Sequence, residues 1–170
     1  LALIIFITNK RELREMDNTL TQRFQSNGVD INRVVFIPKL AHHDLMTMYQ
    51  HTDVVLDSYF FGGDTTSREA FEIGSPIVTL PDKYLGTRWT QAYYKQMGIT
   101  ELIATDTEDY IQLAVKVGQN KVYASQLRTK ILKSKDKLFY SKEAILGWEQ
   151  MLLDLHEQNK EEGWEDDEEE

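Results

Sequence analysis

A regular alternation of two kinds of apolar segment constrains the fold of this chain more than any other feature of its sequence. Short, almost continuously apolar runs, of which residues 1–7 (LALIIFI) and 33–37 (RVVFI) are the clearest, alternate with longer segments whose apolar residues recur at helical spacing. Strands buried in a parallel sheet have the first pattern, and helices that pack along one side have the second. Repeated strand–helix–strand units of this kind predict a parallel sheet with helices on both faces.

The expected elements follow directly from this pattern. Strands are expected at residues 1–7, 33–37, 53–56, 76–80 and 101–104. Helices are expected at residues 10–26, 42–51, 67–73, 87–97, 107–117, 121–134 and 141–158. The first strand is continuously apolar, so we expect it to be buried on both faces. The predicted fold class is α/β, a Rossmann-like doubly wound parallel sheet with C-terminal helices, which binds ligands at the carboxyl ends of its strands.

Composition and charge narrow the possible partners. The 170 residues are 41% hydrophobic and 28% charged, which is typical of a globular domain. The net charge of −9 comes largely from residues 161–170, which hold 8 of the 28 acidic groups and leave 20 acidic against 19 basic residues elsewhere. Such a composition does not indicate a basic face that could bind nucleic acid. The longest apolar run is far shorter than the roughly 20 residues that cross a membrane, so neither nucleic acid nor membrane is expected as a partner.

The two ends of the chain carry further expectations. Residues 1–158 are predicted to form one domain and residues 159–170 a disordered acidic tail, because like charges repel and little in this run can be buried. The alternative is that the acidic tail binds a basic partner. The chain starts without methionine inside a strand-like run, so we expect a fragment whose N-terminal strand is missing. The absence of cysteine excludes disulfides and thiolate metal sites, and it fits a cytoplasmic or nuclear protein.

The segment after the third expected strand, residues 57–69 (DSYFFGGDTTSRE), carries the clearest chemical signal. Gly62 and Gly63 allow a close approach of the backbone to a ligand, and the helix that follows presents free N–H groups at its start. With the hydroxyls of Thr65 and Thr66, these groups suit a diphosphate, and Glu69 is placed one turn further on to accept hydrogen bonds from ribose hydroxyls.

A purely structural interpretation of the same segment is equally open from the residues alone. Thr66 and Glu69 have the spacing of a capping box, in which both side chains satisfy backbone N–H groups and no ligand binds. The segment also lacks the Walker and dinucleotide-binding patterns of glycines. We therefore keep two interpretations of this segment: a diphosphate site, and a capped helix that binds no ligand.

Residues 53–81 (DVVLDSYFFGGDTTSREAFEIGSPIVTLP) and 84–99 (YLGTRWTQAYYKQMGI) resemble the catalytic C-terminal half of the O-GlcNAc transferase and SPINDLY-like glycosyltransferases. The resemblance extends over about residues 33–118 and implies the C-terminal, donor-binding half of a GT-B fold. It also implies transfer of a sugar such as N-acetylglucosamine from a UDP-sugar to Ser or Thr of an acceptor protein, in enzymes often preceded by tetratricopeptide repeats. No metal or other cofactor is implied.

The resemblance assigns a role to each residue of the loop. Gly62, Gly63, Thr65 and Thr66 match the residues that hold the nucleotide diphosphate. Glu69 matches the acidic residue that contacts the ribose, which is Asp in the animal enzymes.

Other matches lie outside the loop. Leu40 and His42 belong to the segment that flanks the uracil base, and His42 stands where the family has lysine. Leu45 and Met48 replace polar or basic UDP contacts of the animal enzymes. Arg88 matches an arginine that could face the donor phosphates, and a structural ion pair is its equally weighted alternative.

Several polar and aromatic residues have structural interpretations. A metal site at His42 and His43 is disfavoured, because adjacent histidines on a helix point apart and no third ligand lies nearby. Trp89, Tyr93 and Tyr94 are expected in the core or at a domain interface. Asp57 is expected to serve a turn, and Asp64 to cap the loop or lie near the donor.

Two other functions stay open beside the transferase. One is a non-catalytic nucleotide-binding or interaction domain that kept the GT-B fold, which the replacements at His42, Leu45 and Met48 favour. The other is a sugar-nucleotide enzyme of the same fold, such as an epimerase. No general base is apparent in the chain, so we expect a fragment that is inactive without the missing N-terminal catalytic half.

Overall fold

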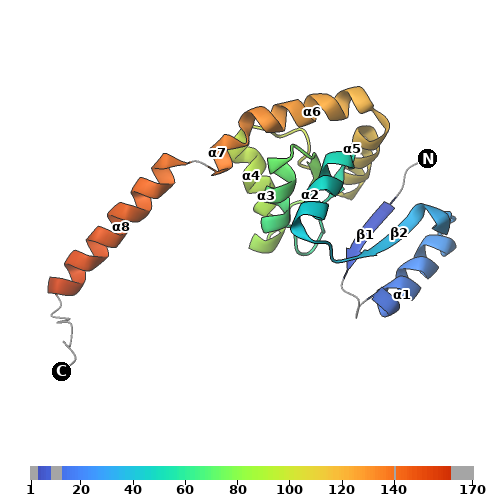
Figure 1. Ribbon diagram of the computed structural model, residues 1–170, viewed down its shortest axis with the longest axis horizontal. Coiled ribbons are helices and arrows are strands. Elements are labelled where there is room, and N and C mark those ends of the chain that lie inside the picture. Colours follow the sequence, from blue (N-terminus) through green and yellow to red (C-terminus); the bar gives the residue numbers. More distant parts are fainter. Residues whose placement is uncertain (1–3, 9–12, 140, 162–170) are drawn as a thin grey trace.

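The structure of the chain is a computed structural model, which describes residues 4–8, 13–139 and 141–161. Strand β1 (Ile4–Thr8) is followed by α1 (Leu13–Ser26), β2 (Val34–Pro38), α2 (His42–His51), β3 (Val55–Leu56), α3 (Thr65–Glu72), β4 (Ile77–Val78) and α4 (Trp89–Met97). Helices α5 (Thr107–Gln119), α6 (Lys121–Ser134), α7 (Asp136–Phe139) and α8 (Lys142–Glu161) complete the chain, and short 3-10 helices cover Ile31–Arg33 and Leu85–Thr87 (Figure 1). Parallel strands joined by helices, with helices at the C-terminal end, confirm the predicted α/β class.

The first strand pair is formed by β1 and β2, which run parallel in register from Ile4 opposite Val34 to Thr8 opposite Pro38. On the side of α1, the ring of Phe6 stacks on Phe36 at 5.3 Å and contacts Phe24 of α1 at 6.0 Å. Side chains of the other face, such as Ile5, are exposed. The expected burial of this strand on both faces is therefore wrong, because α1 packs on one face and the alternate side chains meet solvent.

The second strand pair is formed by β3 and β4, which place Val55 opposite Ile77 and Leu56 opposite Val78. Within the described residues the two pairs are separate two-stranded sheets rather than one continuous sheet. The strand expected at residues 101–104 is reduced to one parallel bridge between Thr79 and Ile103. This reduction has a local cause, because the Ile103 N–H donates to the Thr100 carbonyl in a turn at 3.1 Å.

The core lies where β4 meets helices α3 to α6. Phe71 of α3 and Tyr94 of α4 are fully buried and pack edge to face, with ring centroids 4.7 Å apart. The Tyr94 hydroxyl donates to the Ile77 carbonyl and accepts from the Ile77 N–H, both at 2.8 Å. Burial raises the pKa of Tyr94 well above its usual value. The expectation that Tyr94 is a core residue is confirmed, and its hydrogen bonds tie α4 to β4.

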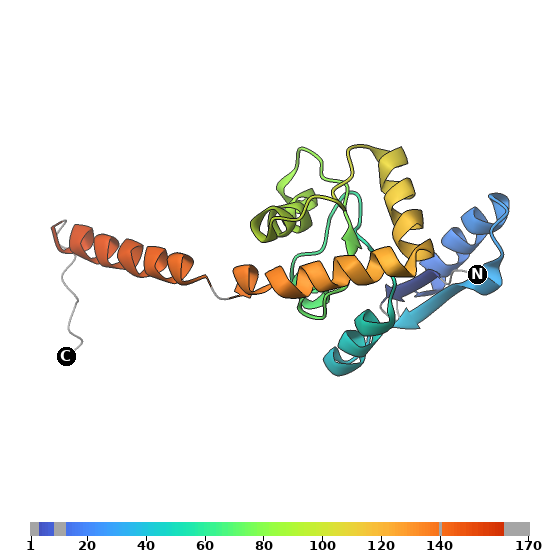
Figure 2. The ribbon, with the colours of Figure 1, turned by 90° about the horizontal axis from the view of Figure 1, so that it is seen from above.

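Helix α8 projects away from the rest of the molecule in both views (Figures 1 and 2). Its described side chains are all exposed, although Ile145, Trp148 and Leu152 form an apolar stripe. The helix ends at Glu161, so the first three residues of the expected tail are helical, and residues 162–170 lie outside the described part. No helix among the described residues has both the length and the apolar character needed to span a membrane.

Candidate functional site

The candidate site is the loop that joins the carboxyl end of β3 to the start of α3. Parallel α/β folds bind ligands at this edge of the sheet. The loop covers residues 57–64, and its neighbours are the loop that precedes α4 and the N-terminal end of α2. Three features fix the geometry of the loop: a buried aspartate, two closely packed glycines and hydroxyl groups on α4.

Asp57 anchors the loop. Its carboxylate is buried, with 8% of the residue exposed, and accepts the Gly63 N–H at 2.8 Å through Oδ1 and the Thr79 hydroxyl at 2.8 Å through Oδ2. Burial raises the pKa of Tyr110 to about 12, with a contribution from the Asp57 charge, so the Tyr110 hydroxyl stays protonated and donates to the Asp57 carbonyl at 2.9 Å. A buried carboxylate is costly unless it is hydrogen-bonded, so these partners stabilise one loop conformation. Asp57 therefore does more than serve a turn.

Both glycines stand where a side chain would collide. A Cβ on Gly62 would lie 3.0 Å from each carboxylate oxygen of Asp57. A Cβ on Gly63 would lie 2.6 Å from the hydroxyl oxygens of Thr66 and Ser67. The Gly62 N–H donates to the Gly86 carbonyl at 2.8 Å, which joins the loop to the segment before α4. Gly62 therefore leaves room for the Asp57 carboxylate, and Gly63 leaves room for the hydroxyls in the first turn of α3.

Helix α3 begins at Thr65, two residues earlier than expected, and its N-terminus is uncapped. Asp64 occupies the N-cap position, but its side chain makes no capping hydrogen bond. Thr66 lies inside the helix and Glu69 bonds elsewhere, so the capping-box interpretation is wrong. Thr65 and Thr66 are exposed, and their hydroxyls have no hydrogen-bond partner within the described residues. The first turn of α3 thus has N–H groups and threonine hydroxyls without a hydrogen-bond partner among the described residues, at the positive end of the helix.

The N-terminal end of α2 lies beside this helix. His42 Nδ1 is 3.3 Å from Glu69 Oε1, which brings together the residues expected near the base and the ribose. Leu40 is half-buried on the segment that leads into α2. Leu45 and Met48 pack against the hydrophobic core, which explains why these two positions of α2 are apolar.

Arg88 is placed at the start of α4, between two contacts to the loop. The Gly86 carbonyl accepts from the loop at 2.8 Å, and the Thr90 hydroxyl donates to the Gly63 carbonyl at 3.4 Å. The Arg88 side chain is exposed and forms no ion pair with any described residue. The structural ion pair that was the alternative for this residue is therefore not made here.

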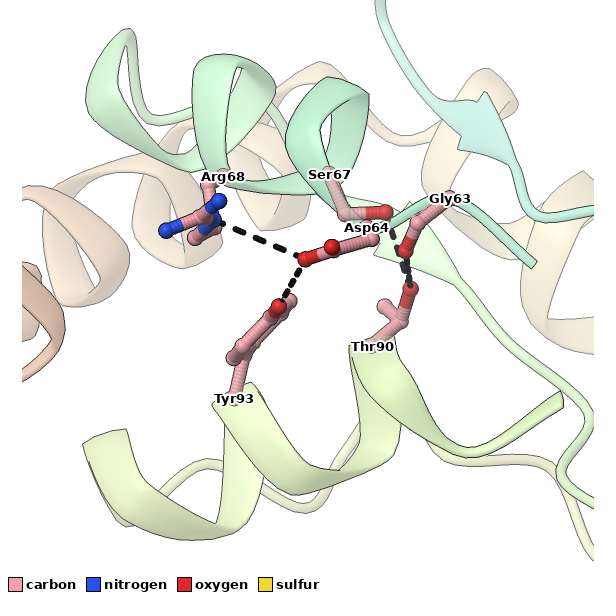
Figure 3. A network of polar contacts seen from close by, with 6 residues as sticks. All are labelled: Gly63, Asp64, Ser67, Arg68, Thr90 and Tyr93. Carbon is pink, nitrogen blue, oxygen red and sulfur yellow. Dashed lines mark hydrogen bonds and ion pairs between the residues drawn. The ribbon is translucent and has the colours of Figure 1, made fainter. Parts of the chain in front are cut away.

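Hydroxyls of α4 hold the loop and the first turn of α3 together (Figure 3). Ser67 and Thr90 share a buried hydrogen bond of 2.9 Å, and the Tyr93 hydroxyl donates to Asp64 Oδ1. Arg68 Nε also lies 3.6 Å from the same Asp64 oxygen. Burial raises the pKa of Tyr93 to about 12, and the hydrogen bond to Asp64 adds to this shift, so the hydroxyl is a donor at neutral pH.

Sequence reasoning missed this role of α4. It assigned Tyr93 to the core or an interface and gave Thr90 no role. The only available signal was their spacing of three residues, which puts both hydroxyls on one face of a helix. That signal does not say which loop the face meets.

No group of three or more His, Asp or Glu side chains in the described part is arranged to hold a metal ion. His42 and His43 each lie near one carboxylate, Glu69 at 3.3 Å and Asp44 at 3.5 Å. The two histidines thus engage different acidic residues rather than a common centre.

Parallel strand–helix units with a glycine-containing polar turn at the end of one strand define a Rossmann-like α/β domain. The sequence model of Glycosyl transferase family 41 matches residues 12–145, and the chain therefore belongs to this glycosyltransferase family. The predicted relationship to the O-GlcNAc transferase and SPINDLY-like enzymes is confirmed.

Three relatives illustrate the similarity. The chain is 30% identical over 104 residues to the UDP-N-acetylglucosamine–peptide N-acetylglucosaminyltransferase of Caenorhabditis elegans, covering 61% of this chain and 9% of that protein. It is 29% identical over 116 residues to the probable SPINDLY transferase of Petunia hybrida, covering 65% and 12%. A solved structure of a mutant O-GlcNAc transferase of Thermobaculum terrenum matches with a TM-score of 0.76 and 26% identity, over 88% of this chain and 30% of that one. The chain thus spans about a tenth of the curated relatives.

Proposed function

We propose that residues 1–158 form the nucleotide-sugar-binding part of a family 41 glycosyltransferase, and that the enzyme transfers a GlcNAc-like sugar from a UDP-sugar to Ser or Thr of an acceptor protein. The uncapped N-terminus of α3 carries this proposal. Its N–H groups and the hydroxyls of Thr65 and Thr66 are free, whereas most helix starts satisfy such groups internally. A diphosphate supplies the acceptor oxygens that this arrangement lacks.

The remaining contacts fit the other parts of a nucleotide. Glu69 accepts the ribose hydroxyls, and His42 and Leu40 flank the base from the start of α2. Arg88, exposed and unpaired among the described residues, approaches the phosphates from the start of α4. The names of the relatives support uridine as the base and N-acetylglucosamine as the sugar, since the Caenorhabditis elegans protein is named for both.

The site would act by stabilising the leaving diphosphate. When an acceptor hydroxyl attacks the anomeric carbon, the bond from that carbon to the diphosphate breaks and negative charge collects on the phosphate oxygens. Fixed N–H and hydroxyl donors at a helix N-terminus favour that charge without a metal ion. No residue of the chain is assigned as general base, so the acceptor side and the proton transfer belong to the N-terminal half, and this chain alone is expected to turn over negligibly. We place the enzyme in the cytoplasm or nucleus.

A non-catalytic nucleotide-binding or interaction domain is the second candidate. The observation that favours it is the apolar character of Leu45 and Met48, which pack on the core where a transferase of this family is expected to contact UDP. Such a domain would keep the loop contacts and lose discrimination among nucleotides.

Calorimetric titration of UDP into the chain and into its Glu69→Ala variant tests the proposal. We expect UDP to bind the chain, and the variant to bind at least tenfold more weakly, because hydrogen bonds to a charged group are typically worth about 1.5–3 kcal/mol. Glu72→Ala is the matched control, since it removes an exposed carboxylate one turn further along the same helix.

Two outcomes would contradict the proposal. Equal loss of affinity in both variants would place UDP away from the loop. Equal binding of UDP and GDP would favour the non-catalytic domain, since a transferase specific for a UDP-sugar must discriminate between the bases.

A further inference from the structure

Asp64 occupies the position where an aspartate normally closes the start of a helix. An N-cap aspartate accepts the backbone N–H of the second or third helical residue, which in α3 are Thr66 and Ser67. Here the carboxylate makes no such bond. It points instead toward α4, where Oδ1 accepts the Tyr93 hydroxyl, and toward Arg68 Nε at 3.6 Å (Figure 3).

The position of the Asp64 carboxylate matters because this carboxylate and a diphosphate would bind the same backbone N–H groups. Both are anions whose oxygens accept hydrogen bonds from the first N–H groups of α3. A free Asp64 side chain would reach those groups from the adjacent position and would also repel the phosphates. An aspartate at this place is compatible with anion binding only while its carboxylate is held elsewhere and its charge is balanced.

The contacts around α4 provide both conditions. Ser67 and Thr90 share a buried hydrogen bond, which fixes α4 against the first turn of α3. Tyr93 lies three residues beyond Thr90 on the same helix face and reaches the carboxylate. Arg68, one turn along α3, balances the charge.

We propose that Tyr93 is a positioning residue that holds the Asp64 carboxylate off the N-terminal N–H groups of α3 and so keeps the diphosphate site open. The inference rests on the proposed donor site for its ligand, but its claim about Asp64 stands on the geometry of the free chain. Removal of the Tyr93 hydroxyl lets Asp64 turn to cap α3 and compete with the nucleotide.

The test uses Tyr93→Phe in the full chain, alone and combined with Asp64→Ala, with UDP as the probe. We expect Tyr93→Phe to weaken UDP binding roughly fivefold, the factor that one N-cap hydrogen bond is typically worth. The double variant should recover the affinity of the unmodified chain or exceed it, because the competing carboxylate is gone. Tyr123→Phe is the matched control, since its half-buried ring lies on α6 and its hydroxyl has no partner among the described residues.

A second measurement does not depend on the ligand. Amide hydrogen exchange at Thr66 and Ser67 should slow in Tyr93→Phe, where Asp64 caps them, and return to the original rate in the double variant. Unchanged exchange in Tyr93→Phe overturns the inference, whether or not UDP binds. If UDP binds and Glu69→Ala weakens it, but Tyr93→Phe does not, the donor site stands and the role of Tyr93 is wrong.

Discussion

Three residues decide the shape of the loop that we assign to the diphosphate. The Asp57 carboxylate is satisfied by a loop N–H and by the Thr79 hydroxyl, 22 residues away in sequence. Gly62 lies against this carboxylate and Gly63 against the hydroxyls in the first turn of α3, so an added side chain would crowd them. The loop is thus fixed by tertiary contacts before a ligand arrives, which reduces the ordering cost of binding.

Substituting Gly63 by alanine tests this packing. A Cβ at 2.6 Å from the hydroxyl oxygens of Thr66 and Ser67 must displace the Ser67 hydroxyl from its buried hydrogen bond to Thr90 or shift the loop, and overpacking of this kind costs about 1–3 kcal/mol of unfolding free energy. We expect a loss in that range by urea denaturation, together with weaker UDP binding. Gly147→Ala is the control, because a Cβ there meets no atom within 4 Å. Equal stability of the two variants would show that the loop tolerates a side chain.

At the scale of elements, the order of strands and helices is readable from the sequence, but their ends are not. Thr66 and Glu69 have the spacing of a cap, yet α3 starts earlier because its first turn packs under Gly63 and bonds to Thr90. Local patterns predict that an element exists, whereas contacts between distant segments decide where it begins.

An ion pair between two such segments gives a prediction about pH. The hydrogen bond from Lys130 of α6 lowers the pKa of Glu101, so the charged form is favoured in the folded chain. The resulting stability is fully present above the ordinary glutamate pKa of 4.5 and is lost as pH falls through the lower pKa of Glu101 in the folded chain. Glu101→Gln should therefore lower the unfolding free energy at pH 7, by less than about 1 kcal/mol because the pair is partly exposed, and should have a smaller effect at pH 3.

Urea denaturation at both pH values measures this difference, and Glu143→Gln on exposed α8 is the control. A deficit of the same size at pH 3 and pH 7 would mean that Glu101 stabilises the turn by its shape rather than its charge.

At the scale of the whole molecule, the alternating apolar pattern was sufficient to predict the α/β class, whereas the family was predicted from the resemblance of residues 53–81 and 84–99. It could not separate strands with two buried faces from strands with one, because an apolar run such as residues 4–8 looks the same in both cases. Nor could it identify the part of α4 that meets the loop. The residues expected to bind the donor were found through the resemblance, and the side chains that position them emerged only with the tertiary contacts.

Helix α8 carries the last prediction. Its side chains are exposed in the described part, and it extends away from the body that contains the core (Figures 1 and 2). Among the described residues of this segment, 141–160, no apolar side chain is buried, so deleting residues 141–170 should change the unfolding free energy of the rest by no more than about 0.5 kcal/mol. The comparison is Ile131→Ala at a fully buried position of α6, which should lower the unfolding free energy by about 2–5 kcal/mol. A deletion that destabilises the chain as much as Ile131→Ala would mean that α8 folds back onto the body in solution.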